Sequence, residues 1–340
     1  MRNSIEDVAA HADVSITTVS RVINNSPHRV SEKTREKVLQ AIKELNYQPD
    51  AAAQNLRANY TNVLAFIGRN LADPYYGEIC RGVSEISLQN NILTFACNTG
   101  HNFSHERNYH RLFAQHKVRG LILSGGGYDS EEYQSLLLNE IHAYAKTQRQ
   151  IVALAPQGPT IDPLVHTIMI DNIKTSYKNT EYLIKKGHKH IAYIGGPEEI
   201  FTAQERLQGY LQALKDYNIP SNTSQIFYAS NFWKEGYEFA QQVIRNNKNC
   251  TAIYCANDNI AISAMNGCLD LGLKIPDDIS FISIGGLPDN SYMMPKLTTA
   301  AIPLYELGTK AVELILNNSD EKVHITLDAP IIDGNSVREI

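Results

Sequence analysis

The amino-acid sequence predicts an α/β protein with a small helical head, a short linker helix and a large body of two lobes, each built on a parallel sheet. Three observations predict this fold class. Apolar residues at the start of the chain recur with helical spacing, an alanine-rich segment follows, and short apolar runs then alternate with amphipathic helical segments in two successive series. Such alternation is typical of parallel sheets whose two faces are both covered by helices.

Composition narrows the class of protein. The chain has 340 residues, of which 43% are hydrophobic, so it can bury the cores of two or three domains. No apolar run reaches the roughly 18 residues that span a bilayer, and the N-terminus lacks the apolar stretch of a signal peptide, so neither a membrane protein nor a secreted one is expected. The five cysteines form no CxxC pair, which favours reduced thiols in the cytoplasm.

Two short helices open the chain, the first capped by Ser4 and the second, Ile16–Ile23, capped by Ser15. Two such helices joined by three or four residues form a helix-turn-helix. A third helix begins at Ser31 and runs to about Leu45. A three-helix bundle with no role in DNA binding would have the same apolar pattern.

The polar face of the second helix favours a role in DNA binding. Its side chains are short or fork-shaped donors that can reach base edges and phosphates in a major groove: Thr17, Thr18, Ser20 and Arg21. Charge does not settle the question, because basic and acidic side chains nearly balance over residues 1–60 and the net charge of the chain is -5.

The alanine-rich segment that begins at Asp50 predicts a linker helix of about two turns, which is marginal alone in water. We expect it to be ordered only when it is docked. Leu56 is the type of side chain that wedges between base pairs from the minor groove. A plain linker is the alternative.

The body elements follow in order from Thr61. Strands are predicted at 63–67, 92–96, 120–123 and 151–154, then at 167–170, 191–194, 252–254 and 281–284; helices are predicted within 73–89, at 109–115, 173–186, 203–216, 234–245 and 260–271. In such folds ligands bind at the carboxyl ends of the strands and in the cleft between lobes.

The run IEDVAAHADVSITTVSRVIN, followed by VSEKTREKVLQAIKELNYQPDAAAQNLRA, resembles the DNA-binding head and hinge of the LacI/GalR family of bacterial transcription regulators. The resemblance continues over nearly the whole chain, in segments at 171–172, 187–192, 206–210, 256–258, 276–280 and 295–299. It implies a helix-turn-helix head at 1–48, a hinge helix and linker at 49–60, and a body at 61–340 that is similar to periplasmic sugar-binding proteins.

The resemblance also implies that the chain crosses between the lobes near 160, 291 and 323. The first lobe would then hold 61–160 and 291–323, and the second 161–290 and 324–340. By the same resemblance, the protein is expected to be a homodimeric, sequence-specific repressor that binds a palindromic double-stranded DNA operator and is controlled allosterically by a small carbohydrate-type ligand. No cofactor, metal or membrane is expected, and no residue set favours an enzyme.

The resemblance implies a set of DNA contacts. In the head these are Ser15, Ile16, Thr17, Thr18, Ser20, Arg21 and Ser31, with Ser15 and Ser31 on phosphates; in the hinge they are Ala53, Leu56 and Arg57.

The resemblance also implies a set of ligand contacts, whose side chains suit a sugar, because a sugar needs paired hydrogen-bonding groups and an aromatic face. The candidates are Asp73, Tyr75, Ser124, Asp171, Arg206, Trp233, Asn257 and Asp289. Several alternatives stay open. Asp171 could simply cap a helix, Arg206 could lie on a surface, Tyr75 and Tyr76 could be packing residues, and Phe232 could replace Trp233 or neither could serve.

One departure from the family concerns the ligand. The family often places an aspartate that grips the effector where this chain has Gly285. Asp289 is the candidate replacement. The missing carboxylate keeps a second hypothesis open, a regulator controlled by a phosphorylated carrier protein instead of a sugar. A cytosolic sugar-binding protein with an inert head is a third.

Overall fold

The computed structural model describes residues 3–23, 28, 30–48, 60–146, 149–221, 225–230 and 232–340. The chain forms two compact units, Met1–Thr61 and Asn62–Ile340. The predicted hinge contacts Ala53, Leu56 and Arg57 lie outside the described residues.

The head consists of α1 (Ile5–His11), α2 (Ile16–Ile23) and α3 (Glu32–Glu44). The Ser4 hydroxyl accepts from the backbone N–H of Asp7, and the Asp7 carboxylate accepts from the backbone N–H of Ser4, which closes a capping box. Small apolar side chains from all three helices form the core: Val8, Ala9, Ala12, Val19, Val22, Val38 and Ala41. Helices α1 and α2 therefore form the predicted helix-turn-helix, and α3 packs against both of them in the same core.

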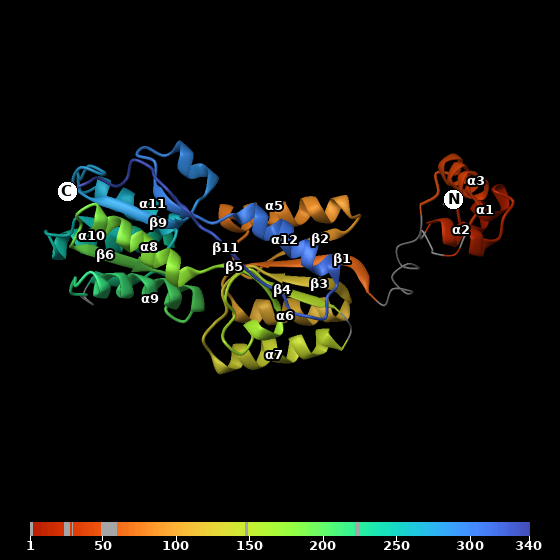
Figure 1. The fold of residues 1–340 in the computed structure, drawn as a ribbon, viewed down its shortest axis with the longest axis horizontal. Helices are drawn as coiled ribbons and strands as arrows, with labels where there is room; N and C mark the ends of the chain where they lie inside the picture. Colours follow the sequence, from red (N-terminus) through yellow and green to blue (C-terminus); the bar gives the residue numbers. More distant parts are fainter. Residues whose placement is uncertain are drawn as a thin grey trace. The chain divides into compact units, whose positions relative to one another are not determined.

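The first sheet of the body has the strand order β11-β5-β4-β3-β1-β2. Its strands are β1 (Thr61–Gly68), β2 (Leu93–Asn98), β3 (Val118–Leu123), β4 (Gln150–Ala153), β5 (His166–Ile170) and β11 (His324–Leu327). Helices α5 (Pro74–Gln89) and α12 (Leu304–Asn317) cover one face, while α6 (Phe103–Gln115) and α7 (Glu131–Ala145) cover the other (Figure 1). We call this assembly the first lobe.

The second sheet has the order β12-β10-β9-β8-β6-β7. Its strands are β6 (Ile191–Gly195), β7 (Ile226–Tyr228), β8 (Ala252–Cys255), β9 (Ser280–Gly285), β10 (Thr298–Ala301) and β12 (Ile331–Ile332), of which β12 runs antiparallel to β10. Its helices are α8 (Asn172–Lys185), α9 (Phe201–Asp216), α10 (Phe232–Asn246) and α11 (Asp258–Leu269). We call this assembly the second lobe.

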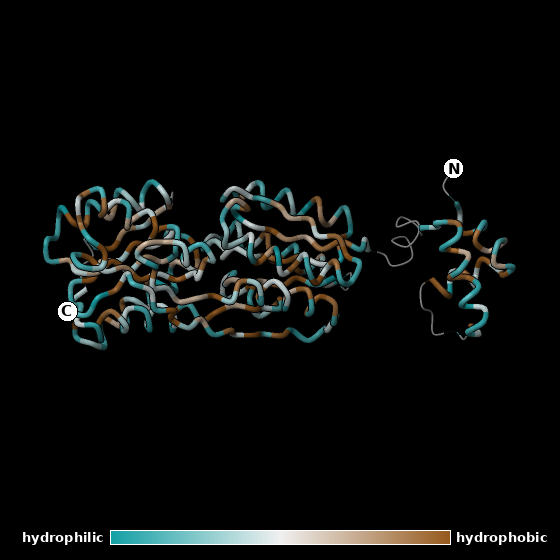
Figure 2. Tube along the Cα trace, turned by 90° about the horizontal axis from the view of Figure 1, so that it is seen from above, coloured by the Kyte–Doolittle hydropathy of each residue, from teal (hydrophilic) through white to brown (hydrophobic). Residues whose placement is uncertain are grey.

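Alternation along the central strands explains why helices cover both faces of the second sheet. Tyr193 of β6 and Tyr254 of β8 pack in one core with residues of α8 and α9, whereas Ile194 and Ile253 pack in another with residues of α10 and α11. All four side chains are fully buried. Figure 2 shows hydrophobic segments running through the interior of the body.

The lobe boundaries implied by the resemblance were wrong by several residues. Strand β5, which ends at Ile170, and strand β11 pair in the first sheet, whereas β10 pairs in the second. The crossings therefore follow these three strands, near 171, 302 and 328, instead of preceding them near 160, 291 and 323. A strand belongs to the sheet that holds its pairing partner, and its own apolar pattern does not reveal that partner.

Within the described parts of the chain, every helix falls short of the length and apolar character that crossing a bilayer requires.

Candidate functional site

Helix α2 of the head presents a polar, solvent-facing side. Val19 and Val22 turn into the core, while Ile16, Thr17 and Arg21 are exposed. Ile16 is an isoleucine left 46% exposed at the first turn, where an apolar contact such as a thymine methyl group could cover it. The exposed face therefore carries both apolar and hydrogen-bonding side chains, as direct readout of a major groove requires.

Hydroxyls cap α2 and α3 of the head. Ser15 Oγ accepts from the backbone N–H of Thr18 at 3.1 Å, and Ser31 Oγ accepts from that of Thr34 at 3.2 Å. Ser20, the remaining predicted DNA contact of α2, is partly buried. Helix N-termini carry unpaired N–H groups and a partial positive charge, which suit the phosphate role predicted for Ser15 and Ser31.

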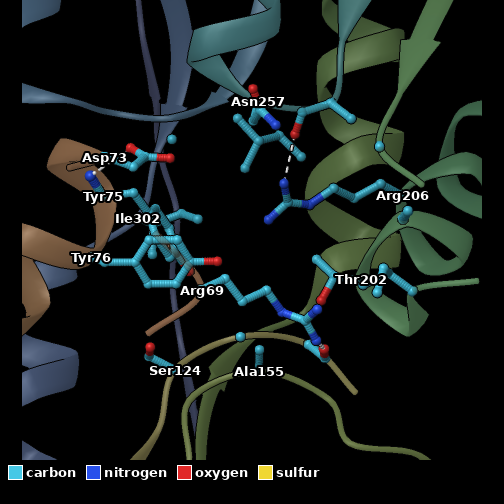
Figure 3. Close-up of a pocket in the computed structure, with 18 of the residues that line it drawn as sticks. Arg69, Asp73, Tyr75, Tyr76, Ser124, Ala155, Thr202, Arg206, Asn257 and Ile302 are labelled. Carbon is cyan, nitrogen blue, oxygen red and sulfur yellow. Dashed lines mark hydrogen bonds between the residues drawn. The ribbon is translucent and has the colours of Figure 1, made fainter. Parts of the chain in front are cut away.

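The body contains a cavity at the carboxyl ends of both sheets, lined from both lobes (Figure 3). Five predicted ligand contacts line it: Asp73, Tyr75, Ser124, Arg206 and Asn257. Six polar residues that were not predicted as ligand contacts also line it: Arg69, His101, Asn172, Thr202, Asp258 and Asn259.

Arg206 of α9 points into this cavity and is only 9% exposed, so the alternative of a surface arginine is wrong. Its Nε donates to Asn172 Oδ1 at 2.9 Å, and its Nη1 donates to the backbone carbonyl of Ala256 at 2.6 Å. Two of its three nitrogens are therefore held by protein acceptors, which fixes the plane of the guanidinium. A planar, oriented fork is suited to paired oxygens of a ligand.

Asp73 caps α5 and links the lobes. One carboxylate oxygen accepts from the backbone N–H of Tyr75 at 3.0 Å, and the other accepts from Asn259 Nδ2 of the second lobe at 2.8 Å. Burial raises the pKa of this carboxyl, and the two hydrogen bonds oppose that rise. Tyr75 and Tyr76 pack edge to face with ring centroids 5.1 Å apart, so each both packs and lines the cavity.

Ser124 and Asn257 also lie at strand ends. Ser124 Oγ donates to the carbonyl of Ile67 at 2.8 Å, and Asn257 Oδ1 accepts from the backbone N–H of Ile260 at 2.8 Å as the cap of α11. Both residues line the cavity.

Three other predicted ligand contacts do not line this cavity. Asp171 is exposed and caps α8, with its carboxylate accepting from the backbone N–H of Lys174 at 2.9 Å, while its neighbour Asn172 lines the cavity. Trp233 is 56% exposed, and Phe232 lines the cavity in its place. Asp289 is exposed in a short 3-10 helix. The direction in which a side chain points at the start of a helix depends on the residue at which the helix begins. The sequence pattern did not determine that residue.

The carboxylate beside Gly285 is that of Asp258. It is buried and accepts from Ser283 Oγ at 2.5 Å, Asn290 Nδ2 at 2.7 Å, Thr299 Oγ1 at 2.8 Å and the backbone N–H of Leu287 at 2.9 Å. Four donors therefore satisfy the two oxygens of this carboxylate. Asp258 therefore ties β9 to β10 at the edge of the cavity.

Most of the chain matches known protein families. Residues 61–332 match the family of periplasmic binding proteins and the sugar binding domain of the LacI family, and residues 4–50 match the bacterial regulatory proteins of the lacI family. This chain belongs to the LacI family. The predicted fold class is thereby confirmed, and the chain is a helix-turn-helix transcriptional regulator.

Relatives that are named transcriptional regulators span nearly the same length. The transcriptional repressor PurR of Histophilus somni is 33% identical over 319 residues, 94% of this chain and 93% of the relative. The transcriptional regulator RegA of Clostridium saccharobutylicum is 33% identical over 334 residues, 97% of this chain and 96% of the relative.

Solved structures of the LacI family are similar in fold. The lac repressor dimer bound to operator and the anti-inducer ONPF has a TM-score of 0.84 at 25% identity, covering 99% of this chain and 100% of that one. The regulator CelR in complex with cellobiose has a TM-score of 0.72 at 25% identity, covering 98% and 100%.

Proposed function

We propose that this LacI-family regulator is a cytoplasmic homodimer that represses transcription from a palindromic operator, and that a carbohydrate-type ligand bound in its cleft sets operator affinity. The observation that carries the proposal is the cavity at the strand ends, lined by polar and aromatic side chains from both lobes, in a chain that also has a helix-turn-helix head. The family's solved structures include a cellobiose complex and an operator complex of a dimer, which supports both halves of the proposal.

In the proposed complex with DNA, α2 of each head enters the major groove of one operator half-site. Ile16, Thr17 and Arg21 would read base edges there, while Ser15 and Ser31 would hold phosphates beside the helix N-termini. The hinge at 49–60 would pair over the operator centre, with the two Leu56 side chains opening a base step.

In the proposed ligand complex, aromatic side chains contact the apolar side of the sugar and polar side chains bind its hydroxyl groups. Tyr75 and Phe232 offer ring faces or edges to the apolar side of a sugar. Arg206 and Asn257 offer oriented donors to hydroxyl oxygens, and Asp73 offers a carboxylate that accepts from hydroxyl protons. Donors and acceptors on opposite walls fit a small molecule with many hydroxyl groups.

Control of DNA binding would come from closure of the lobes. Besides the bond between Asp73 and Asn259, the backbone N–H of Asp129 donates to the carbonyl of Glu199 at 2.8 Å, and that of Phe201 donates to the carbonyl of Gly127 at 3.1 Å. A ligand that contacts both lobes favours the closed arrangement, in which these hydrogen bonds between the lobes are made. It shifts the equilibrium between the open and closed arrangements by its difference in affinity for them.

The proposal is tested by selecting bound DNA from a random duplex pool at fixed salt, with and without a pool of neutral and acidic sugars. We expect a palindrome whose enrichment changes when the sugars are added. An enriched palindrome that no sugar affects would overturn the carbohydrate part of the proposal and favour a protein partner. No enrichment in either arm would overturn operator binding by the head.

A further inference from the structure

The cleft contains a buried arginine whose charge is not balanced by an ion pair. Arg69 follows β1 and is 5% exposed, and its guanidinium lies 4.2 Å above the ring of Tyr128. Nη2 donates to the backbone carbonyl of Gly126, but Nη1 is buried and has no hydrogen-bond acceptor among the described residues. None of the ion pairs found in the described part of the chain includes Arg69.

A second unsatisfied group faces it from the other lobe. Thr202 lies in the first turn of α9, and its Oγ1 is also buried without a partner. Glycines bring the two side chains together: a Cβ at Gly125 would collide with Arg69 Nε, and one at Gly126 would collide with Thr202 Oγ1. Both side chains line the same cavity, and in the view of Figure 3 the Thr202 side chain is drawn next to the Arg69 guanidinium. One acceptor placed there could bond to both.

The buried carboxyl of Glu106 does not pair with Arg69. Glu106 Oε1 lies 3.0 Å from the Tyr133 hydroxyl, which also lies 2.8 Å from Gln157 Oε1. The Gln157 amide nitrogen donates to the carbonyls of Gly125 and Ala155, so its oxygen can only accept. The hydroxyl has one proton for two acceptors, and both contacts become hydrogen bonds only if Glu106 is protonated. Burial raises the pKa of Glu106, and the nearby charge of Arg69 and the Tyr133 hydroxyl oppose that rise.

The other acidic groups that line the cavity are already engaged. Asp73 accepts from Tyr75 and Asn259, and Asp258 is surrounded by its four donors. A sugar hydroxyl could accept from Arg69 Nη1, but it would leave the positive charge uncompensated in a buried site. An anionic oxygen would supply both the acceptor and the charge.

We propose that the effector carries an anionic group, a carboxylate or a phosphate, that accepts from Arg69 Nη1 and Thr202 Oγ1 in the closed cleft. This inference rests on the proposed function and names its ligand class, an acidic sugar derivative. Because Arg69 belongs to the first lobe and Thr202 to the second, the anionic group joins the lobes directly. An acidic ligand therefore favours closure more than its neutral parent does.

The first test uses fragments of the ligand as probes on the full chain. Acetate and inorganic phosphate are compared with chloride at equal ionic strength, and the melting temperature is measured for the wild type, Arg69→Gln and the control Arg111→Gln, an exposed arginine on α6 of the same lobe. We expect one of the two anions to raise the melting temperature of the wild type and the control but not of Arg69→Gln. Equal responses in all three proteins, or none, would overturn the inference.

The second test measures binding by calorimetry with matched sugars: glucose, glucuronate and glucose 6-phosphate, and the corresponding galactose series. We expect the carboxylate or the phosphate member to bind at least 10-fold more tightly than its neutral parent. Arg69→Gln should remove about 100-fold of that affinity, as expected for loss of one partner of a buried charge pair, and Arg69→Lys should restore part of it. Neutral members that bind as tightly as both acidic ones would overturn the inference.

A variant at Thr202 and a parallel measurement of operator affinity separate failure of the inference from failure of the proposed function. Thr202→Val keeps the shape of the side chain but removes its hydroxyl. It should lower the affinity for the acidic ligand several-fold and leave the affinity for the neutral parent unchanged. This variant tests the inference even if Arg69→Gln does not fold. Operator affinity is followed in the same samples. If only neutral sugars bind and release the operator, the anionic inference fails and the proposed function stands. If an acidic sugar binds without changing operator affinity, the proposed function fails and the inference stands.

Discussion

The carboxylate of Asp258 fills the space into which a side chain at position 285 would point. A Cβ built on Gly285 would lie 2.6 Å from the carboxyl carbon of Asp258, closer than real contacts allow. An aspartate at 285 would also place a second carboxyl group against that of Asp258. The position of the Asp258 carboxylate therefore requires a glycine at 285.

We predict that Asp258→Asn destabilises the body. The asparagine has one acceptor oxygen in place of two, so donors among Ser283, Leu287, Asn290 and Thr299 lose their partner. The cost should be about 2–4 kcal/mol of unfolding free energy, measured by urea denaturation. Asp289→Asn, on the exposed 3-10 helix, is the control and should change stability by less than about 0.5 kcal/mol. Similar effects for both variants would contradict the role of Asp258.

Arg206→Ala should separate ligand response from DNA binding. Arg206 touches Asn172, Ala256 and the cavity, all within the body, so operator affinity without ligand should change less than about threefold. The ligand concentration for half-maximal response should rise by about 100-fold, because an oriented charged donor is lost. Fluorescence anisotropy of labelled operator measures both quantities, with the exposed Arg245→Ala as the control. An undiminished response would show that Arg206 is not a ligand contact.

Leu56→Ala should weaken specific operator binding while the head stays folded. If the hinge leucines open a base step, the variant loses that contact and the bend that depends on it. We expect a loss of 10-fold or more in specific affinity, a smaller bend angle by energy transfer between DNA ends, and unchanged affinity for random duplex. Unchanged bending and affinity would contradict the hinge wedge.

Acid should destabilise the body through His110. This side chain is buried in α6, and burial lowers its pKa to about 4. An unfolded histidine titrates near 6.5, so between these values the unfolded chain binds more protons and stability falls as pH falls. The contribution should be about 2 kcal/mol smaller at pH 5 than at pH 7.

His110→Gln checks this assignment. It should flatten the dependence of unfolding free energy on pH between 7 and 5, whereas His142→Gln, exposed on α7, should leave the wild-type slope in place. Identical slopes in all three proteins would assign the pH dependence to other groups, among them His166, whose pKa is also lowered to about 4.

The head and the strand-end residues could be predicted because their signals are local. Caps and apolar spacing define α1 to α3, and parallel strands bring their carboxyl ends to one edge, which is why Asp73, Ser124 and Asn257 meet at the cavity. The lobe crossings could not be predicted in the same way, because the sheet that takes up β5 or β10 is decided by its pairing partner.

Arg69 was missed because an arginine just after a buried strand is typical of a solvent-facing strand end. The close packing of Gly125 against Arg69 and the Tyr128 ring over its guanidinium make it a buried side chain of the cleft. The resemblance implied Asp171, not its neighbour Asn172, as the ligand contact. Both precede or open α8, and the helix register alone decides which of them faces the cavity.

The strand order has a consequence for synthesis on the ribosome. The edge strand β11 of the first sheet and the edge strand β12 of the second come from 324–327 and 331–332, far along the chain from both sheets' first strands. A nascent chain has all three helices of its head long before either lobe can be completed. The unit proposed to read DNA thus forms early in translation, and the unit proposed to sense the effector forms late.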